Sequence, residues 1–287
     1  PTQKALFGFG TTGSYTAVTN LVNSSGVVGS DVTGVGTARH GLAAANFGGD
    51  KAIFGYGYSS AARVATTNLV SNEGVVASDT SGVGSVRYHL AAATFGGDKA
   101  IFGYGNTGSM VSITNLVSSS GVVATDTTGV GTARNGLGAA EFGVGLAIFA
   151  YGNGGSDVSM SNLVSNLGVV ATDVSGVGTA RRFLAAASYG GDKAIFGYGI
   201  GGSSSSLTNL VNNSGVVASD VSGVGTARAE LAATSYGGDK AIFGYGVTGS
   251  NVSMTNLVNN SGVVAADVDG VGTARNTLAA AGYSFSA

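Results

Sequence analysis

The chain has 287 residues, enough for a large core, and its composition narrows the classes of function. Charged residues make up 10% of it and the net charge is -2, so the chain has no basic field that would attract nucleic acid or an anionic membrane. It contains no cysteine, which excludes disulfides and thiolate metal ligands.

The mean hydropathy of +0.31 does not come from membrane-spanning segments. The long uncharged stretch at residues 100–125 is rich in Gly, Ser, Asn and Thr, and no apolar run reaches the roughly 18 residues that a spanning helix needs. The first residues, PTQKALF, lack the charged and apolar regions of a signal peptide. We therefore expect no membrane insertion, and we interpret Pro1 as a native amino terminus left by removal of an initiator Met.

The same wording recurs six times along the chain, most fully in residues 36–57 (GTARHGLAAANFGGDKAIFGYG). The phenylalanine that opens each FGYG-like motif returns after 47, 48, 47, 47 and 47 residues, at Phe7, Phe54, Phe102, Phe149, Phe196 and Phe243. The copies fill the chain and leave no linker, so the sequence predicts a single domain over residues 1–287.

Each copy contains four short segments, which we name a to d in the order in which they follow the arginine. Their examples are a, residues 42–47 (LAAANF); b, residues 51–57 (KAIFGYG); c, residues 19–22 (TNLV); and d, residues 74–79 (GVVASD). Gly- and Ser-rich clusters mark turns between them. No segment is long enough for a helix and glycine interrupts every one, so the pattern predicts an all-β fold.

Four short strands per copy, with segment b apolar on both faces, predict blades packed face to face. The sequence thus predicts a six-bladed β-propeller of four-stranded blades, with 47 or 48 residues per repeat. Alanine is a poor strand former, so the alanine-rich segment a suits the crowded axis. Bulkier Ile53, Phe54 and Tyr56 belong one strand further out. The C-terminal strand, residues 278–285, is expected to join the three N-terminal strands and close the ring.

The order of these signals resembles the kelch repeat. Arg39 stands where that family has an arginine before the inner strand, and residues 52–57 (AIFGYG) match its hydrophobic second strand ending in two glycines. An aromatic residue splits the glycine pair here, and Val75 and Val76 stand where kelch repeats carry Trp. The resemblance implies a kelch-like propeller and little about function. Repeats of the chromosome-condensation-regulator type share the glycine-rich second strand and are the alternative family.

The wording GDKAIFGYG…TNLV…GVGTAR is also similar to repeats in virion and tail-fibre-like proteins of marine bacteriophages. That resemblance implies a structural or binding role in a phage particle. It would place the protein in the virion, with other virion proteins or a host surface glycan or protein as partners.

An arginine and an aspartate recur in every copy, the aspartate eight residues before the arginine. The arginines are Arg39, Arg87, Arg134, Arg181, Arg228 and Arg275, and the aspartates are Asp31, Asp79, Asp126, Asp173, Asp220 and Asp267. We interpret them as structural pairs that brace each d-to-a turn, since a role repeated in every copy is usually architectural. The alternative is a ring of guanidinium groups near the axis that binds an anion.

Positions that differ between copies are the better candidates for recognition. They lie in the pair after each arginine and in the b-to-c loops, which antiparallel connectivity places on one face, here named the arginine face. The candidate binding residues are Tyr15, Tyr58, Arg63, Tyr88, His89, Arg182 and Phe183. The opposite face, named the Gly-Gly-Asp face, carries repetitive a-to-b turns. The fourth copy breaks their pattern with an apolar spot at residues 144–146 (VGL), a candidate partner contact.

The sequence argues against a cofactor, a metal site and an enzyme. No glycine-rich string has a P-loop ending, and two histidines, His40 and His89, are expected on an exposed loop rather than at a metal. The Ser-x-Asp-x-Gly-x-Thr-Trp boxes of sialidases and the cysteine of galactose-oxidase-like enzymes are absent. We expect a non-enzymatic structural or binding protein of a phage virion. The alternatives are a cytoplasmic kelch-type interaction scaffold and an engineered or recently amplified repeat protein.

Overall fold

The computed structural model describes residues 2–287, and there it is all-β, as the sequence predicted. Pro1, which we interpreted as a native amino terminus, lies outside the described residues. Across the described part of the chain, no helix has the length and apolar character required to cross a membrane.

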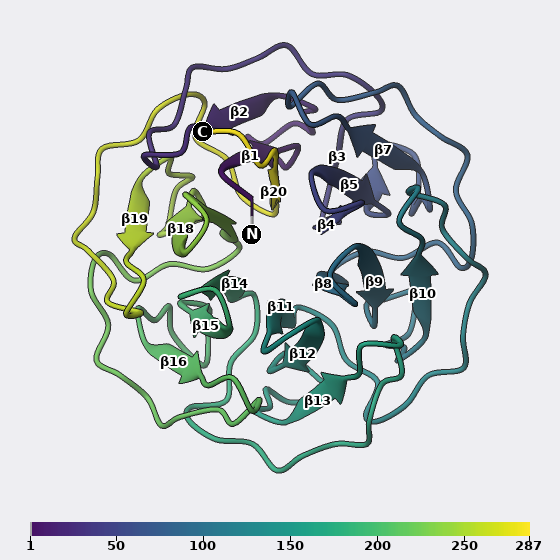
Figure 1. The fold of residues 1–287 in the computed structure, drawn as a ribbon, viewed down its shortest axis with the longest axis vertical. Helices are drawn as coiled ribbons and strands as arrows, with labels where there is room; N and C mark the ends of the chain where they lie inside the picture. The colour runs from purple at the N-terminus through teal and green to yellow at the C-terminus, as the bar shows by residue number, and fades with distance from the viewer. Residues whose placement is uncertain (1) are drawn as a thin grey trace.

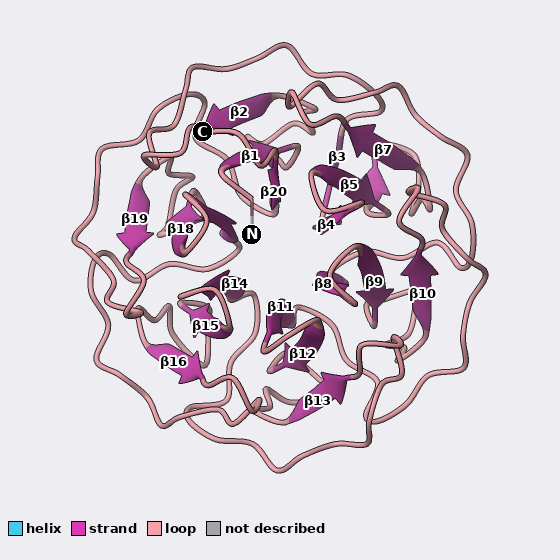
Figure 2. Cartoon of the chain, in the orientation of Figure 1, coloured by secondary structure: helices cyan, strands magenta, loops and turns pink. Residues whose placement is uncertain are grey.

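Over residues 2–287 the strands form six antiparallel three-stranded sheets and one two-stranded sheet, of β3 (Arg39–His40) and β6 (Tyr58–Ser59). The sheets stand around a central axis in a propeller-like arrangement (Figure 1), joined by long loops (Figure 2). From the axis outward, the three-stranded sheets are β20 (Ala279–Tyr283), β1 (Lys4–Gly8), β2 (Thr19–Val22); β4 (Ala43–Phe47), β5 (Lys51–Gly55), β7 (Thr67–Val70); β8 (Ala91–Phe95), β9 (Lys99–Gly103), β10 (Thr114–Val117); β11 (Gly138–Phe142), β12 (Leu146–Ala150), β13 (Ser161–Val164); β14 (Ala185–Tyr189), β15 (Lys193–Gly197), β16 (Thr208–Val211); β17 (Ala232–Tyr236), β18 (Lys240–Gly244), β19 (Thr255–Val258).

The two ends of the chain share one sheet, which confirms the predicted closure. β20 pairs antiparallel with β1, with Leu6 opposite Ala281, and β20 also contacts β17 and β4 on its two sides. The backbone amide of Gln3 donates to the carbonyl of Ser284 over 2.8 Å. Because the last strand pairs with the first, β1 is a central strand with a partner along each of its edges.

The expected fourth strand of each repeat is not a regular strand, so the prediction of four-stranded blades is wrong in this detail. Segment d is held by two isolated bridges, such as Val22 with Val28 and Thr19 with Val32. The two bridges differ in register by one residue, which is the signature of a β-bulge. The amide of Asn20 donates to the carbonyl of Gly29 inside this bulge over 3.0 Å. A side chain therefore replaces part of the missing ladder.

Side chains along the inner strands point alternately into the core between sheets and toward the central axis. In β4 the side chains of Ala43, Ala45 and Phe47 are buried between sheets, whereas Ala44 and Asn46 are partly exposed along the axis. The prediction that the alanine-rich segment is innermost is confirmed. Packing between sheets is close enough that Gly8 has no room for a side chain, since a Cβ there would lie 2.8 Å from the ring of Phe54.

Candidate functional site

The six repeated arginines of the d-to-a turns are buried inside the fold and are not exposed along the axis. All of them, Arg39, Arg87, Arg134, Arg181, Arg228 and Arg275, have 0% exposure. In one repeat, the Nε of Arg39 donates to the carbonyl of Tyr56 over 2.8 Å, and an Nη donates to Asn68 over 2.7 Å. Its guanidinium lies 4.3 Å from the ring centroid of Phe9 on the adjacent sheet. These groups lock each sheet to its neighbour, and the complete burial of the guanidinium groups keeps them away from the axis, where an anion ring would have to lie.

The partner of each arginine differs from the one that sequence proximity suggested. Arg39 lies 4.0 Å from Asp79, which ends segment d of the same sheet, while Asp31 accepts a hydrogen bond from the backbone amide of Thr273. Burial alone would raise the pKa of Asp79, but hydrogen bonds from Thr37 and Asn68 outweigh it and lower that pKa. The corresponding ion pairs are Arg87–Asp126, Arg134–Asp173, Arg181–Asp220 and Arg228–Asp267. The aspartate therefore fastens the outer segment of its own sheet to the start of the inner strand.

The candidate binding residues of the arginine face form one connected cluster. Ring contacts run from Tyr15 to His40 (4.8 Å between centroids), and from Tyr58 to Tyr88 (5.6 Å). They continue from Tyr88 to His89 (4.4 Å), and His89 meets Phe183 edge-on at 4.9 Å. These residues come from four different sheets. We name the aromatic cluster as Tyr15, His40, Tyr58, Tyr88, His89 and Phe183.

His40 is the member that the sequence reasoning missed as a site residue. Its ring contacts Tyr15, Tyr58, Tyr88 and His89. The signal was present, because His40 occupies the variable position directly after an arginine, the same position as Tyr88. The expectation that His40 and His89 lie on an exposed loop is wrong, since both are partly buried among the rings.

A closed circle of backbone hydrogen bonds places this cluster over the axis. The second residue after each arginine donates its amide to the carbonyl of the equivalent residue on the adjacent sheet, over 2.7 to 2.9 Å. The members are Gly41, His89, Gly136, Phe183, Glu230 and Thr277. All have positive φ, between 48° and 61°. A positive φ is strained for His89 and Phe183 and unstrained for glycine. The circle of hydrogen bonds, and not the backbone preference of each residue type, therefore fixes φ at these positions.

The two glycines of the circle make room for the two rings. A Cβ at Gly41 would lie 2.7 Å from the ring of His89, and a Cβ at Gly136 would lie 3.0 Å from that of Phe183. Glycine at these two positions therefore lets the imidazole and the phenyl ring spread over the axis. The other arc of the circle, with Glu230 and Thr277, lacks aromatic residues.

Burial and charge set the protonation of the histidines. Burial, with a smaller contribution from the charge of His40, lowers the pKa of His89 to about 4. Burial also lowers the pKa of His40, whose Nδ1 lies 3.2 Å from the hydroxyl of Thr277. Both rings are thus favoured as neutral at pH 7. The Nε2 of His89 is buried with no hydrogen-bond partner within residues 2–287.

Two arginines border the aromatic cluster in different electrostatic states. Arg182 pairs with Asp157 over 2.7 Å and stacks its guanidinium 5.7 Å from the ring centroid of Phe183. Arg63 lies 5.5 Å from the ring centroid of Tyr88, and in the described chain no carboxylate lies within ion-pair distance of it. Arg63 is therefore the cation of this face that has its charge available for a ligand.

The Gly-Gly-Asp face is dominated by local ion pairs. Each lysine of a turn meets the preceding aspartate, as Lys51 meets Asp50 over 2.8 Å, and both side chains are partly exposed. The fourth copy differs as the sequence indicated, since Val144 is 93% exposed. Phe285, 59% exposed, lies on the same face beside Gly49.

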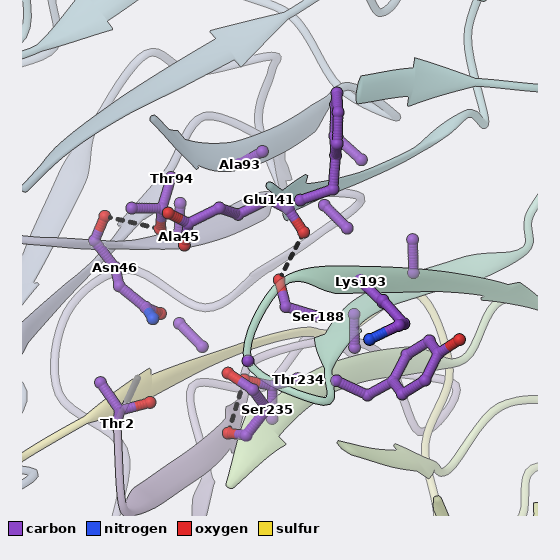
Figure 3. A pocket seen from close by; sticks show the side chains of 18 of the residues that line it. Thr2, Ala45, Asn46, Ala93, Thr94, Glu141, Ser188, Lys193, Thr234 and Ser235 are labelled. Atoms are coloured by element: carbon purple, nitrogen blue, oxygen red, sulfur yellow. Dashed lines mark hydrogen bonds between the residues drawn. The ribbon is translucent and has the colours of Figure 1, made fainter. Parts of the chain in front are cut away.

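An axial pocket of about 380 Å³ opens on the Gly-Gly-Asp face. Its deeper wall is a layer of alanines, namely Ala44, Ala92, Ala139, Ala186, Ala233 and Ala280. Two residues further along each strand, nearer the mouth, lies a polar layer of Asn46, Thr94, Glu141, Ser188 and Ser235 (Figure 3). The sequence reasoning named no residue of this layer, although the position varies between copies.

Comparison with known proteins adds no family to this description. No protein-family model matches the chain, and no curated protein sequence matches it.

Proposed function

We propose that the chain is a non-enzymatic binding module, built as a six-bladed kelch-like β-propeller, that recognises a glycan through the aromatic cluster on its arginine face. The observation that carries the proposal is the concentration of Tyr15, His40, Tyr58, Tyr88, His89 and Phe183 on one arc of an otherwise repetitive scaffold. Aromatic rings offer large, rigid contact area at low entropic cost, and tyrosine and arginine are the side chains that most often anchor interfaces.

The type of ligand follows from the chemistry of this surface. Aromatic rings stack on the apolar faces of sugars, and the tyrosine hydroxyls and Arg63 can bond sugar hydroxyls or carboxylates. Together with the likeness of the repeat wording to phage virion proteins, this favours a virion component, such as a tail appendage, adhesin or capsid decoration. Its partner would then be a host surface glycan.

The test is binding to an array of neutral and acidic glycans, followed by attachment to cells that display the bound sugars. Replacing Tyr88, Arg182 and Phe183 together by alanine should lower binding at least tenfold. The control replaces Lys51, Lys99 and Lys193 by alanine on the opposite face and should bind like the parent protein. Unchanged binding by the first variant, with loss of binding in the control, would place the site on the Gly-Gly-Asp face and contradict the proposal.

A further inference from the structure

The axial pocket lies at the opposite end of the axis from the aromatic cluster, and its chemistry is independent of it. The closed circle of backbone bonds and a ring of leucines, including Leu42, Leu90 and Leu137, stand at the arginine end of the axis. The second glycines of the a-to-b turns, such as Gly49 and Gly97, line the other end. The pocket therefore opens toward the Gly-Gly-Asp face.

The polar layer of this pocket presents acceptors. The hydroxyl of Ser188 donates its proton to the carbonyl of Glu141 over 2.8 Å, and that of Thr94 donates to the carbonyl of Asn46 over 3.2 Å (Figure 3). A hydroxyl that donates its hydrogen bond to a backbone carbonyl still has oxygen lone pairs that can accept a hydrogen bond from a ligand.

Glu141 is the carboxylate of this polar layer. The other two acids that line the pocket, Asp192 and Asp239, are held at its mouth by Lys193 and Lys240 at 2.7 and 3.3 Å. Within residues 2–287 no cation and no hydrogen-bond donor is placed on the side-chain carboxyl of Glu141. Burial raises the pKa of this carboxyl to about 7. A cationic donor entering the pocket would favour the ionised form.

The residues that line the pocket favour an organic cation over a metal ion as its ligand. A hard metal ion needs several charged or carbonyl oxygens, and no group of three or more His, Cys, Asp or Glu that could hold one occurs among the described residues. The alanine layer lies two residues deeper than Glu141, about 7 Å along the strand. That depth suits an alkyl chain of about four carbons, whose apolar surface the methyl groups of the alanine walls would cover.

We propose that the axial pocket binds a small primary alkylammonium ion, with its ammonium group at Glu141 and its alkyl chain against the alanine layer. The three N–H donors of the ammonium match the carboxylate and the hydroxyls of Thr94 and Ser188, which lie on the two strands that flank β11.

The probe is n-butylammonium, titrated into the full chain and followed by saturation-transfer NMR of the ligand. We expect saturable binding with a Kd on the order of 1 mM, given the few atoms of the ligand. Glu141→Gln should weaken binding at least tenfold. Glu73→Gln, which removes the same charge from an exposed turn of the same face, should leave the Kd unchanged. Ala92→Leu, which fills the alanine layer without touching the carboxylate, should also abolish binding.

The neutral analogue n-butanol is the decisive comparison. It should bind at least tenfold more weakly than n-butylammonium. Equal binding of the two, unaffected by Glu141→Gln, would show a merely apolar cavity and overturn the proposal, as would the absence of any saturable signal. Thermal melts of each variant confirm that a lost signal reflects the pocket and not an unfolded chain.

Discussion

The guanidinium of Arg39 lies 4.0 Å from the carboxylate of Asp79, forty residues further along the chain, and not beside Asp31, eight residues before it. Asp79 closes the outer segment of a sheet, and Arg39 precedes the inner strand of that same sheet. The pair therefore spans the whole width of one sheet. This relationship explains why the arginine and the aspartate recur together in every copy.

Removing one of these arginines should destabilise the protein strongly. In Arg134→Ala the carbonyl of Tyr151, the side chain of Asn162 and the carboxylate of Asp173 lose their shared donor. A buried polar group left without its partner costs roughly 1 to 3 kcal/mol, so losing the donor to both Tyr151 and Asn162 should cost about 3 kcal/mol or more. Asp173 keeps its hydrogen bonds from Thr132 and Asn162. Chemical denaturation of this variant measures the loss. Lys99→Ala, at a solvated pair, is the control and should cost less than about 1 kcal/mol. An equal, small loss in both variants would contradict the bracing role.

Closure of the ring should be required for cooperative unfolding. Deleting residues 277–287 removes β20 and leaves the edge of β1 and the inner faces of β17 and β4 uncovered. Unpaired strand edges and exposed apolar faces promote aggregation. We expect the truncated protein to aggregate or to lose its sharp thermal transition, measured by calorimetry and light scattering. Deletion of residues 286–287 alone, beyond the paired strand, should leave the transition in place. An unchanged melt after the longer deletion would disprove the closed arrangement.

A methyl group at Gly136 should disturb the aromatic cluster. Gly136→Ala places a Cβ 3.0 Å from the ring of Phe183, at a backbone φ of 61°. We expect Phe183 to move away from His89, the protein to lose about 1 kcal/mol of stability and the glycan affinity to fall. Gly155→Ala is the matched control, since its φ is 107° and nothing lies within 4 Å of the added carbon. The control should share the loss of stability and keep its affinity. Equal affinities in the two variants would separate Phe183 from the binding site.

Acidification should weaken the fold through His89. Its folded-state pKa, about 4, lies below the ordinary value of 6.5, so the unfolded chain binds more protons between these values. The stabilising effect of neutral His89 is therefore complete above pH 6.5 and is lost as the pH falls toward 4. Urea unfolding at intervals of half a pH unit measures the slope, and His89→Asn should reduce it.

Glu141 opposes this trend and has to be removed separately. Its folded-state pKa is raised to about 7, so the folded chain binds the extra proton and Glu141 favours folding below pH 4.5 more than above pH 7. Glu141→Gln should steepen the fall in stability on acidification between pH 7 and 4.5. Because the two shifts are of similar size and opposite sign, the double variant with His89→Asn should keep nearly the parental slope. If neither single variant changes the slope, neither residue contributes to it.

Much of the fold could be predicted because it depends on local and repeated signals. The spacing of the phenylalanines set the repeat, and the TNLV strand at Thr19–Val22 has the predicted bounds. The inner position of the alanine-rich strand followed from side-chain size. The outer segment was predicted less well, because Asn20 bonds the backbone of segment d and a bulge replaces the regular ladder. The pattern of apolar and polar residues does not reveal that a side-chain hydrogen bond takes the place of a backbone one.

The sequence by itself determined the repeat, the all-β character, the closure by the two chain ends and the face on which variable residues gather. Only the tertiary structure decided which residues meet. It paired Arg39 with Asp79, made His40 the centre of the aromatic cluster, and brought Glu141 into a pocket with Thr94 and Ser188. The physical reason is that these contacts join different sheets or opposite edges of one sheet. Their distances depend on how the sheets pack around the axis, and neighbouring positions in the chain carry no record of that packing.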